Sequence, residues 1–292
     1  MNRKLELADR GFGYILVAPT FIIILAVILF PIIFAIVSSF FDYTLLNKSF
    51  NNFIGIENYI NSLKNERLIN SIIVTSFFVI LVVLFEFILG FFIALLLNSI
   101  NRFKSVYYFI LLLPLLINPI VVGLIWRMFL HPQLGILNFL LSLFGIGEIN
   151  WLGDPKMAFT TIIFVDIWHQ VSFMIILLLA GLSAIPKEPY EAAKSDGANI
   201  IDCFIHITLP YMRPVIIVTV LIRLIFAIKT YDLIYIMTKG GPGDATDLIS
   251  YYIYRSAFIS LNLGEAAAMS SILLLIIIII TIPLFRYMNR LD

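Results

Sequence analysis

Residues 70–97 read NSIIVTSFFVILVVLFEFILGFFIALLL, and Glu86 is the one charged residue among them. A helix needs about 20 mostly apolar residues, each rising about 1.5 Å, to cross the roughly 30 Å hydrocarbon core of a bilayer. This stretch exceeds that length and is bounded by polar and charged clusters. It predicts a helix that spans a membrane.

Five other stretches have a similar length and apolar character. They run from Gly13 to Phe40, Val106 to Leu130, Met157 to Ala184, Pro214 to Met237 and Glu265 to Arg286. The whole chain is 61% apolar and 13% charged, whereas soluble domains average about 45–50% and about 25%. We therefore expect an all-α, polytopic membrane protein with six transmembrane helices, in which residues 1–292 form a single membrane domain.

The basic residues indicate how the predicted spans are oriented. An even number of spans places both termini on one side of the membrane. With cytoplasmic termini, ten Lys and Arg residues fall in inner segments and six in outer ones, so the positive-inside rule predicts that both termini are cytoplasmic. The ten are Arg3, Lys4, Arg10, Arg102, Lys104, Lys187, Lys194, Arg213, Arg286 and Arg290.

Charge and cysteine content exclude several functions. The formal net charge is +1 in a very apolar chain, which leaves no basic face for nucleic acid. Cys203 is the only cysteine, so the chain can form neither an intrachain disulfide nor a cysteine cluster for a metal. The sequence therefore predicts no nucleic-acid partner and no metal site.

The segment between the fourth and fifth spans, residues 185–213, is the longest on the inner side. Glu188, Pro189 and Glu191 favour the start of a short helix, because proline is tolerated in the first turn and carboxylates suit the positive end of the helix dipole. Asp196-Gly197 would then end this helix and turn the chain. A side chain bulkier than that of Gly197 is expected to block the turn.

A second short helix is predicted from Ile200 to Thr208, and Pro210 is expected to end it. Its apolar residues recur at helical spacing, which gives it one apolar face. A helix this short is marginal in water, so that face has to be buried against something. Two interpretations remain open: the helix lies on its own bundle or at the lipid interface, or it docks on another subunit.

Several short motifs resemble the signature of one protein family. They are Glu191-Ala192-Ala193, Asp196-Gly197-Ala198 and Ile207-Thr208-Leu209-Pro210, together with the blocks at Trp151–Pro155, Ala180–Pro186 and Gly240–Gly243. In this order and spacing they are similar to the EAA motif and its companion blocks in the permeases of binding-protein-dependent ABC importers. The companion blocks resemble their counterparts in the sugar-transport branch, which includes the maltose and glycerol-3-phosphate permeases.

The resemblance implies the type I importer permease fold, a bacterial-type plasma membrane and a set of partners. The implied partners are a second homologous permease, two subunits that bind ATP with Mg²⁺, and an extracytoplasmic solute-binding protein that delivers a carbohydrate. Residues 185–213 would be the segment that couples the permease to an ATPase, and the motif residues there are Glu191, Ala192, Ala193, Asp196, Gly197, Leu209 and Pro210. The chain has no G-x-x-x-x-G-K-[ST] loop to hold phosphates, so we expect it to bind no cofactor and to be no enzyme itself.

Polar residues inside the fourth predicted span share one helix face. They are Asp166, His169, Gln170 and Phe173, at positions i, i+3, i+4 and i+7. Carboxylate and amide groups hydrogen-bond hydroxyls, and an aromatic ring covers the apolar face of a sugar, so this stripe predicts a path for a polyhydroxylated substrate. The alternative is that Asp166 and His169 only bond to neighbouring helices.

In the fifth predicted span, Thr219, Arg223 and Thr230 also share a face, and Arg223 and Thr230 complete the predicted substrate path. Arg223 would either neutralise Asp166 across the bundle or meet a hydroxylated or acidic substrate. The charges at these two positions depart from the maltose permeases, where smaller neutral polar groups are usual, which leaves an acidic substrate open. Glu86 is interpreted as a hydrogen-bonding group between helices, with a proton relay as the alternative.

The predicted function is the permease subunit of an ATP-driven carbohydrate importer. One alternative is a proton-coupled secondary transporter of a polar solute that uses Glu86, Asp166 and His169. Against it, the chain shows no obvious internal repeat, and it has the whole coupling segment, which such a carrier does not need. A membrane scaffold or sensor without transport is the other alternative.

Overall fold

The computed structural model describes residues 2–46, 50–100 and 104–288, and for residues 2–15, 104 and 288 it describes only the backbone. Arg102 and Arg290, two of the basic residues assigned to the inner side, lie outside the described residues. Every regular element in the described ranges is a helix, apart from two isolated β-bridges. The prediction of an all-α fold is confirmed.

The chain divides into two compact units: residues 1–64 with 253–274, and residues 65–252 with 275–292. The first unit contains α1 (Asn2–Ser38), α2 (Glu57–Lys64) and the π-helical turn η2 (Arg255–Ile259). Two helices have residues in both units, namely α12 (Ile249–Tyr254) and α13 (Leu263–Met288).

In the first unit, the chain that leaves α1 is held by hydrogen bonds. Asn58 of α2 is 8% exposed, and its amide donates to the carbonyls of Ser39 and Phe41, each at 2.9 Å. Tyr43 accepts a bond from the backbone N–H of Gly264 at 2.8 Å. These bonds satisfy carbonyl groups just beyond the end of α1 that no further helical turn could satisfy.

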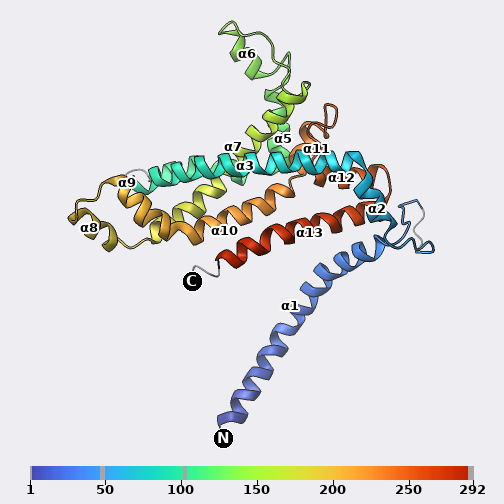
Figure 1. Cartoon of the computed structure of the whole chain (residues 1–292), viewed down its shortest axis with the longest axis horizontal. Helices are drawn as coiled ribbons and strands as arrows, with labels where there is room; N and C mark the ends of the chain where they lie inside the picture. Colours follow the sequence, from blue (N-terminus) through green and yellow to red (C-terminus); the bar gives the residue numbers. More distant parts are fainter. Residues whose placement is uncertain (1, 47–49, 101–103, 289–292) are drawn as a thin grey trace. The chain divides into compact units, whose positions relative to one another are not determined.

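The second unit contains the remaining helices. They are α3 (Glu66–Ser99), α4 (Lys104–Leu116), α5 (Pro119–Phe129), α6 (Ile136–Ser142), α7 (Pro155–Ala184), α8 (Glu188–Ser195), α9 (Ile200–Cys203), the π-helical turn η1 (Phe204–Thr208), α10 (Leu209–Ile228) and α11 (Asp232–Met237). The long helices α3, α7 and α10 pack against one another and form its core (Figure 1). Gly90 permits the close approach of α3 to α7, because a Cβ there would lie 2.7 Å from Met174 Cβ.

Polar side chains start two helices of the second unit. Asn118 accepts a bond from Ile120 N at the start of α5, and Asp154 accepts one from Met157 N at the start of α7, both at 2.9 Å. Each cap satisfies one of the N–H groups that a helix leaves unbonded at its N-terminus. A proline follows each capping residue, at a position where its missing N–H has no partner to lose.

Within the described ranges, five helical stretches are long and apolar enough to cross a bilayer: Leu16–Ser38, Glu66–Ser99, Pro155–Ala184, Ile200–Met237 and Leu263–Tyr287. The predicted third span, Val106 to Leu130, is not one helix, because α4 and α5 meet at 93°. The capped start at Asn118 explains the break, since α5 begins anew there. Counting the bent pair as one span gives the six that the sequence predicts.

The predicted fifth span has different ends in the structure. α10 begins at Leu209 rather than Pro214 and ends at Ile228, with Lys229 as its C-terminal cap. Residues 229–231 separate it from α11. The residues of this break line a cavity.

Candidate functional site

A buried ion network joins α3, α7 and α10. Arg223 is 1% exposed, Glu86 0% and Asp166 4%. Arg223 Nε donates to Glu86 Oε2 at 2.5 Å, and Nη2 donates to Glu86 Oε1 at 2.8 Å and to Asp166 Oδ2. Buried charges are costly unless they are paired and hydrogen-bonded. The network therefore links the three core helices, and each of its charged groups needs its partners to remain buried.

The contact between Arg223 and Asp166 is one of the two roles predicted for Arg223. The sequence did not identify the contact between Arg223 and Glu86. It predicted that Glu86 forms a hydrogen bond between helices, but not with which residue. A signal was present, because ionisable residues inside spans pair with one another. Which of them pair is decided by the packing of α3 on α10, whose residues are far apart in the sequence.

A cavity of about 330 Å³ lies beside this network, at the break between α10 and α11. Its lining residues are Pro119, Asp166, His169, Gln170, Arg223, Phe226, Lys229, Thr230, Tyr231, Asp232 and Leu233. The volume is within the roughly 300–1,000 Å³ of small-molecule sites. Backbone that is not helical is tolerated inside a membrane where it lines a cavity. Residues 229–231 line this one.

The hydrogen bonds of His169 define which polar atoms remain for a ligand. His169 Nε2 lies 3.0 Å from the Ile117 carbonyl oxygen, and Gln170 Nε2 lies 3.0 Å from His169 Nδ1. A neutral imidazole with its proton on Nε2 satisfies both contacts, because it donates to the carbonyl and accepts from the amide. No residue in the described ranges donates to the amide oxygen of Gln170, which leaves it as an acceptor.

The structure brings together five of the six residues predicted for the substrate path: Asp166, His169, Gln170, Arg223 and Thr230 line the cavity. Phe173 does not line it. Its ring lies edge-on to the ring of Phe226, with 6.0 Å between the centroids, and so supports a lining residue.

The reason given for Thr230 was wrong. It was placed on one helix face with Thr219 and Arg223, but α10 ends at Ile228, and Thr230 reaches the cavity from the break. Thr219 lies on α10, is 1% exposed and does not line the cavity. Contact of the lining residues with a substrate stays a prediction.

The segment between α7 and α10 contains the two short helices that the sequence predicts, α8 and α9. Gly197 lies between them with φ +84°, a conformation that other L-residues rarely adopt. A Cβ at Gly197 would have no atom within 4 Å, so the requirement for glycine is conformational and not a lack of space within this chain. The expectation that a bulkier side chain blocks the turn is corrected in this respect.

A capping box that the sequence analysis missed starts α9. Asn199 Oδ1 accepts from Ile201 N (2.8 Å) and Asp202 N (3.0 Å), and Asp202 Oδ2 accepts from Asn199 N (3.0 Å). The signal was an Asn followed three residues later by a carboxylate. The box fixes the direction in which α9 leaves the turn.

Pro210 does not end the second short helix, contrary to the prediction. The chain continues from α9 through η1 into α10, and Leu209 N donates to Phe204 O in the wider π-helical register. Pro210 follows η1 in the first turn of α10, and the chain stays helical through it. The coupling segment is therefore continuous with a core helix.

The motif residues differ in exposure. Glu191, Ala192, Asp196 and Gly197 are exposed, whereas Ala193, Leu209 and Pro210 are half-buried. The polar residues of the turn thus lie at the surface, while Leu209 and Pro210 begin the core helix α10.

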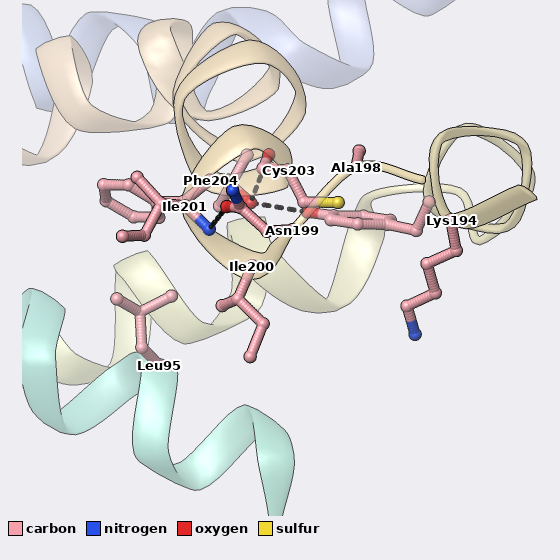
Figure 2. Close-up of a pocket in the computed structure, with 10 residues that line it drawn as sticks. Leu95, Lys194, Ala198, Asn199, Ile200, Ile201, Cys203 and Phe204 are labelled. Atoms are coloured by element: carbon pink, nitrogen blue, oxygen red, sulfur yellow. Dashed lines mark hydrogen bonds between the residues drawn. The ribbon is translucent and has the colours of Figure 1, made fainter. Parts of the chain in front are cut away.

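A groove of about 590 Å³ lies beside α9, between it, Leu95 of α3 and the end of α8 (Figure 2). Ile200 is 88% exposed, Ile201 67% and Ile205 48%. These three side chains are therefore not buried on the helix's own bundle, which leaves the lipid interface or another subunit to cover them. Together they form an apolar surface that no other part of the described chain covers.

Residues 86–292 match the family of binding-protein-dependent transport system inner membrane components. The chain belongs to this family. It is a multi-pass membrane component of a transport system and not an enzyme, which decides against the proton-coupled carrier and the scaffold.

Similar proteins agree with this assignment. The trehalose/maltose transport system permease protein MalF of Thermococcus litoralis is 36% identical, over 93% of this chain and 90% of that protein. The sn-glycerol-3-phosphate transport system permease protein UgpA of Agrobacterium fabrum is 32% identical, over 95% and 94%. A solved bacterial ABC transporter involved in the import of the acidic polysaccharide alginate has a chain that matches this permease with a TM-score of 0.87 and 25% identity, over 99% of both.

Proposed function

We propose that this permease translocates a carbohydrate through the cavity beside Arg223. The cavity carries the proposal, because it places carboxylate, amide and hydroxyl groups and an exposed aromatic ring within a core of apolar helices. Such a lining suits a hydroxylated ligand with apolar ring faces. The substrates named for the similar proteins are trehalose, maltose, glycerol-3-phosphate and alginate. They support a hydroxylated substrate and include both uncharged and acidic ones.

The proposal includes partners and an orientation. Residues 185–213 lie on the cytoplasmic side with both termini and dock on one of two ATPase subunits, which hold ATP and Mg²⁺. A second homologous permease completes the membrane part, and an extracytoplasmic binding protein delivers the substrate. The exposed Ile200 and Ile201, next to the rigid turn at Gly197, support docking at this segment.

The first experiment is gentle purification of the permease from its own membranes, followed by mass spectrometry of the proteins that accompany it in fixed ratio. A second permease and a P-loop ATPase are expected. A chain that is recovered alone, or only with copies of itself, would contradict the proposed assembly.

The second experiment tests the substrate. ATP hydrolysis by the purified complex is measured with a panel of mono- and disaccharides and with amino acids as the control class. We expect stimulation by at least one sugar and by no amino acid. Stimulation by amino acids alone would refute the carbohydrate assignment while leaving the transporter class intact.

A further inference from the structure

The guanidinium of Arg223 lines the cavity, but most of its donors are already in use. Its Nε and Nη2 groups donate to Glu86 and Asp166, whereas Nη1 donates to no atom of the described residues. Arginine recognises a carboxylate or phosphate by two parallel N–H groups on one edge. Glu86 occupies the edge formed by Nε and Nη2, and Asp166 takes Nη2 from the other edge. A ligand is left with the two N–H groups of Nη1, which do not form a complete edge.

The charges around the cavity also oppose an acidic ligand. With both carboxylates ionised, the network of Glu86, Arg223 and Asp166 has an excess negative charge, and with one of them protonated it is neutral. In neither state does Arg223 provide an uncompensated positive charge. Lys229 and Asp232 also line the cavity, and because they add one positive and one negative formal charge, the net charge of the lining stays the same.

Two of the polar atoms in the lining are acceptors without a donor, and they favour a ligand that carries donors. Asp166 uses Oδ2 for Arg223, and no residue in the described ranges donates to its Oδ1. The amide oxygen of Gln170 likewise accepts from no described residue. A hydroxyl group can donate to such acceptors, whereas an ionised carboxylate or phosphate has no hydrogen to donate. The half-exposed ring of Phe226 offers an apolar surface beside them.

We infer that the network of Glu86, Arg223 and Asp166 makes this cavity selective for uncharged hydroxylated sugars over acidic sugars and sugar phosphates. The inference rests on the proposed function and specifies its substrate class. Glu86 does not line the cavity and is a positioning residue, which acts by holding and neutralising Arg223. Asp166 combines this role with direct contact to the ligand.

The test measures ligand binding to the assembled complex in lipid nanodiscs by ligand-observed NMR. The solute-binding protein is omitted, so that its selectivity does not enter. The two probes are maltose and the same disaccharide with one primary alcohol oxidised to a carboxylate. The native complex should bind maltose at least about tenfold more tightly, because one charge at close range changes binding by about this factor or more.

Two variants then remove one negative charge each while keeping a hydrogen-bonding oxygen. Glu86→Gln and Asp166→Asn should each reduce the preference for maltose by about tenfold, because Arg223 gains net positive charge. The matched control is Glu66→Gln, which removes an exposed carboxylate at the start of the same helix as Glu86 and should leave the preference unchanged. If Glu86 and Asp166 had only a structural role, both variants would weaken the binding of the two sugars equally.

The outcomes separate the two proposals. Equal binding of the two sugars to the native complex would overturn the selectivity and leave the carbohydrate assignment standing. An unchanged preference in folded Glu86→Gln and Asp166→Asn would overturn the role of the network. If neither sugar binds and no sugar stimulates ATP hydrolysis, the proposed function fails and the inference fails with it. If both variants fail to assemble, the comparison of the two probes on the native complex decides.

Discussion

The cavity beside Arg223 lies at the break between α10 and α11, and Gly197 lies at the break between α8 and α9. The two regions differ in which side chains are buried and which are exposed. At the cavity, Glu86, Arg223 and Asp166 are almost fully buried and bonded to one another. Around Gly197 the charges are exposed, and apolar side chains such as Ile200 are exposed as well. The ion network is formed within this chain alone, whereas the exposed apolar side chains of the segment are left uncovered by it. Variants should therefore affect folding at the first region and assembly at the second.

The largest effect is expected for Arg223→Ala. The substitution leaves Glu86 and Asp166 buried without their partner, which typically costs about 3–5 kcal/mol. We expect loss of substrate uptake in proteoliposomes together with a lower stability of the permease, measured by denaturant unfolding in detergent.

The matched control is Arg67→Ala, which removes an exposed arginine of α3. It should change the unfolding free energy by less than about 0.5 kcal/mol. An Arg223→Ala protein with native stability would show that the network is not structural, and the contrast between the two regions would then be lost.

The second largest effect is expected at the apolar surface of α9. Replacing Ile200 and Ile201 together by Ser removes two exposed apolar side chains, each of which contributes about 1.5–3 kcal/mol when buried in an interface. The affinity for the ATPase subunit should fall by about a hundredfold or more, measured by titration of the reconstituted permease with the ATPase. The stability of the permease itself should not change.

A control for this double variant is Leu134→Ser, at a residue that is 86% exposed in the connection between α5 and α6. It should retain the native affinity for the ATPase. If the double variant also binds normally, the exposed face of α9 is not the docking surface.

A smaller effect is expected from the turn between α8 and α9. Gly197→Val forces a β-branched residue to φ +84°, at a cost of about 1–3 kcal/mol. Substrate-stimulated ATP hydrolysis should fall by about tenfold, because the turn no longer presents α8 and α9 in one orientation. Gly197→Asn adds a side chain of similar size but tolerates this conformation, and it should retain most of the coupling. Equal losses in both variants would instead point to steric obstruction at the docking surface.

The smallest effect is expected for Tyr190→Phe. The Tyr190 hydroxyl and Thr208 Oγ1 lie 2.9 Å apart and connect α8 to η1. Losing this bond should cost about 1 kcal/mol. Hydrogen exchange of the α8 amides should become several-fold faster, with global stability little changed. Tyr287→Phe, at an exposed tyrosine of α13, is the control, and an unchanged exchange rate in α8 would show that the bond does not hold this helix.

Local signals in the sequence predicted much of this protein. The apolar runs predicted the helices because a bilayer imposes a minimum length, and the turn at Gly197 followed from the preference of glycine for positive φ. Five of the six residues of the predicted substrate path were found at one cavity. Signals of this kind act over a few residues, so they can be read without the fold.

Tertiary structure alone decided the rest. The pairing of Glu86 with Arg223 depends on the packing of α3 against α10, which no local pattern encodes. Pro210 continues a helix because η1 shifts the hydrogen-bond register, and Thr230 reaches the cavity because α10 stops before it. In each case the sequence determined which groups had to be satisfied within the membrane, and the packing determined which partners were near enough to satisfy them.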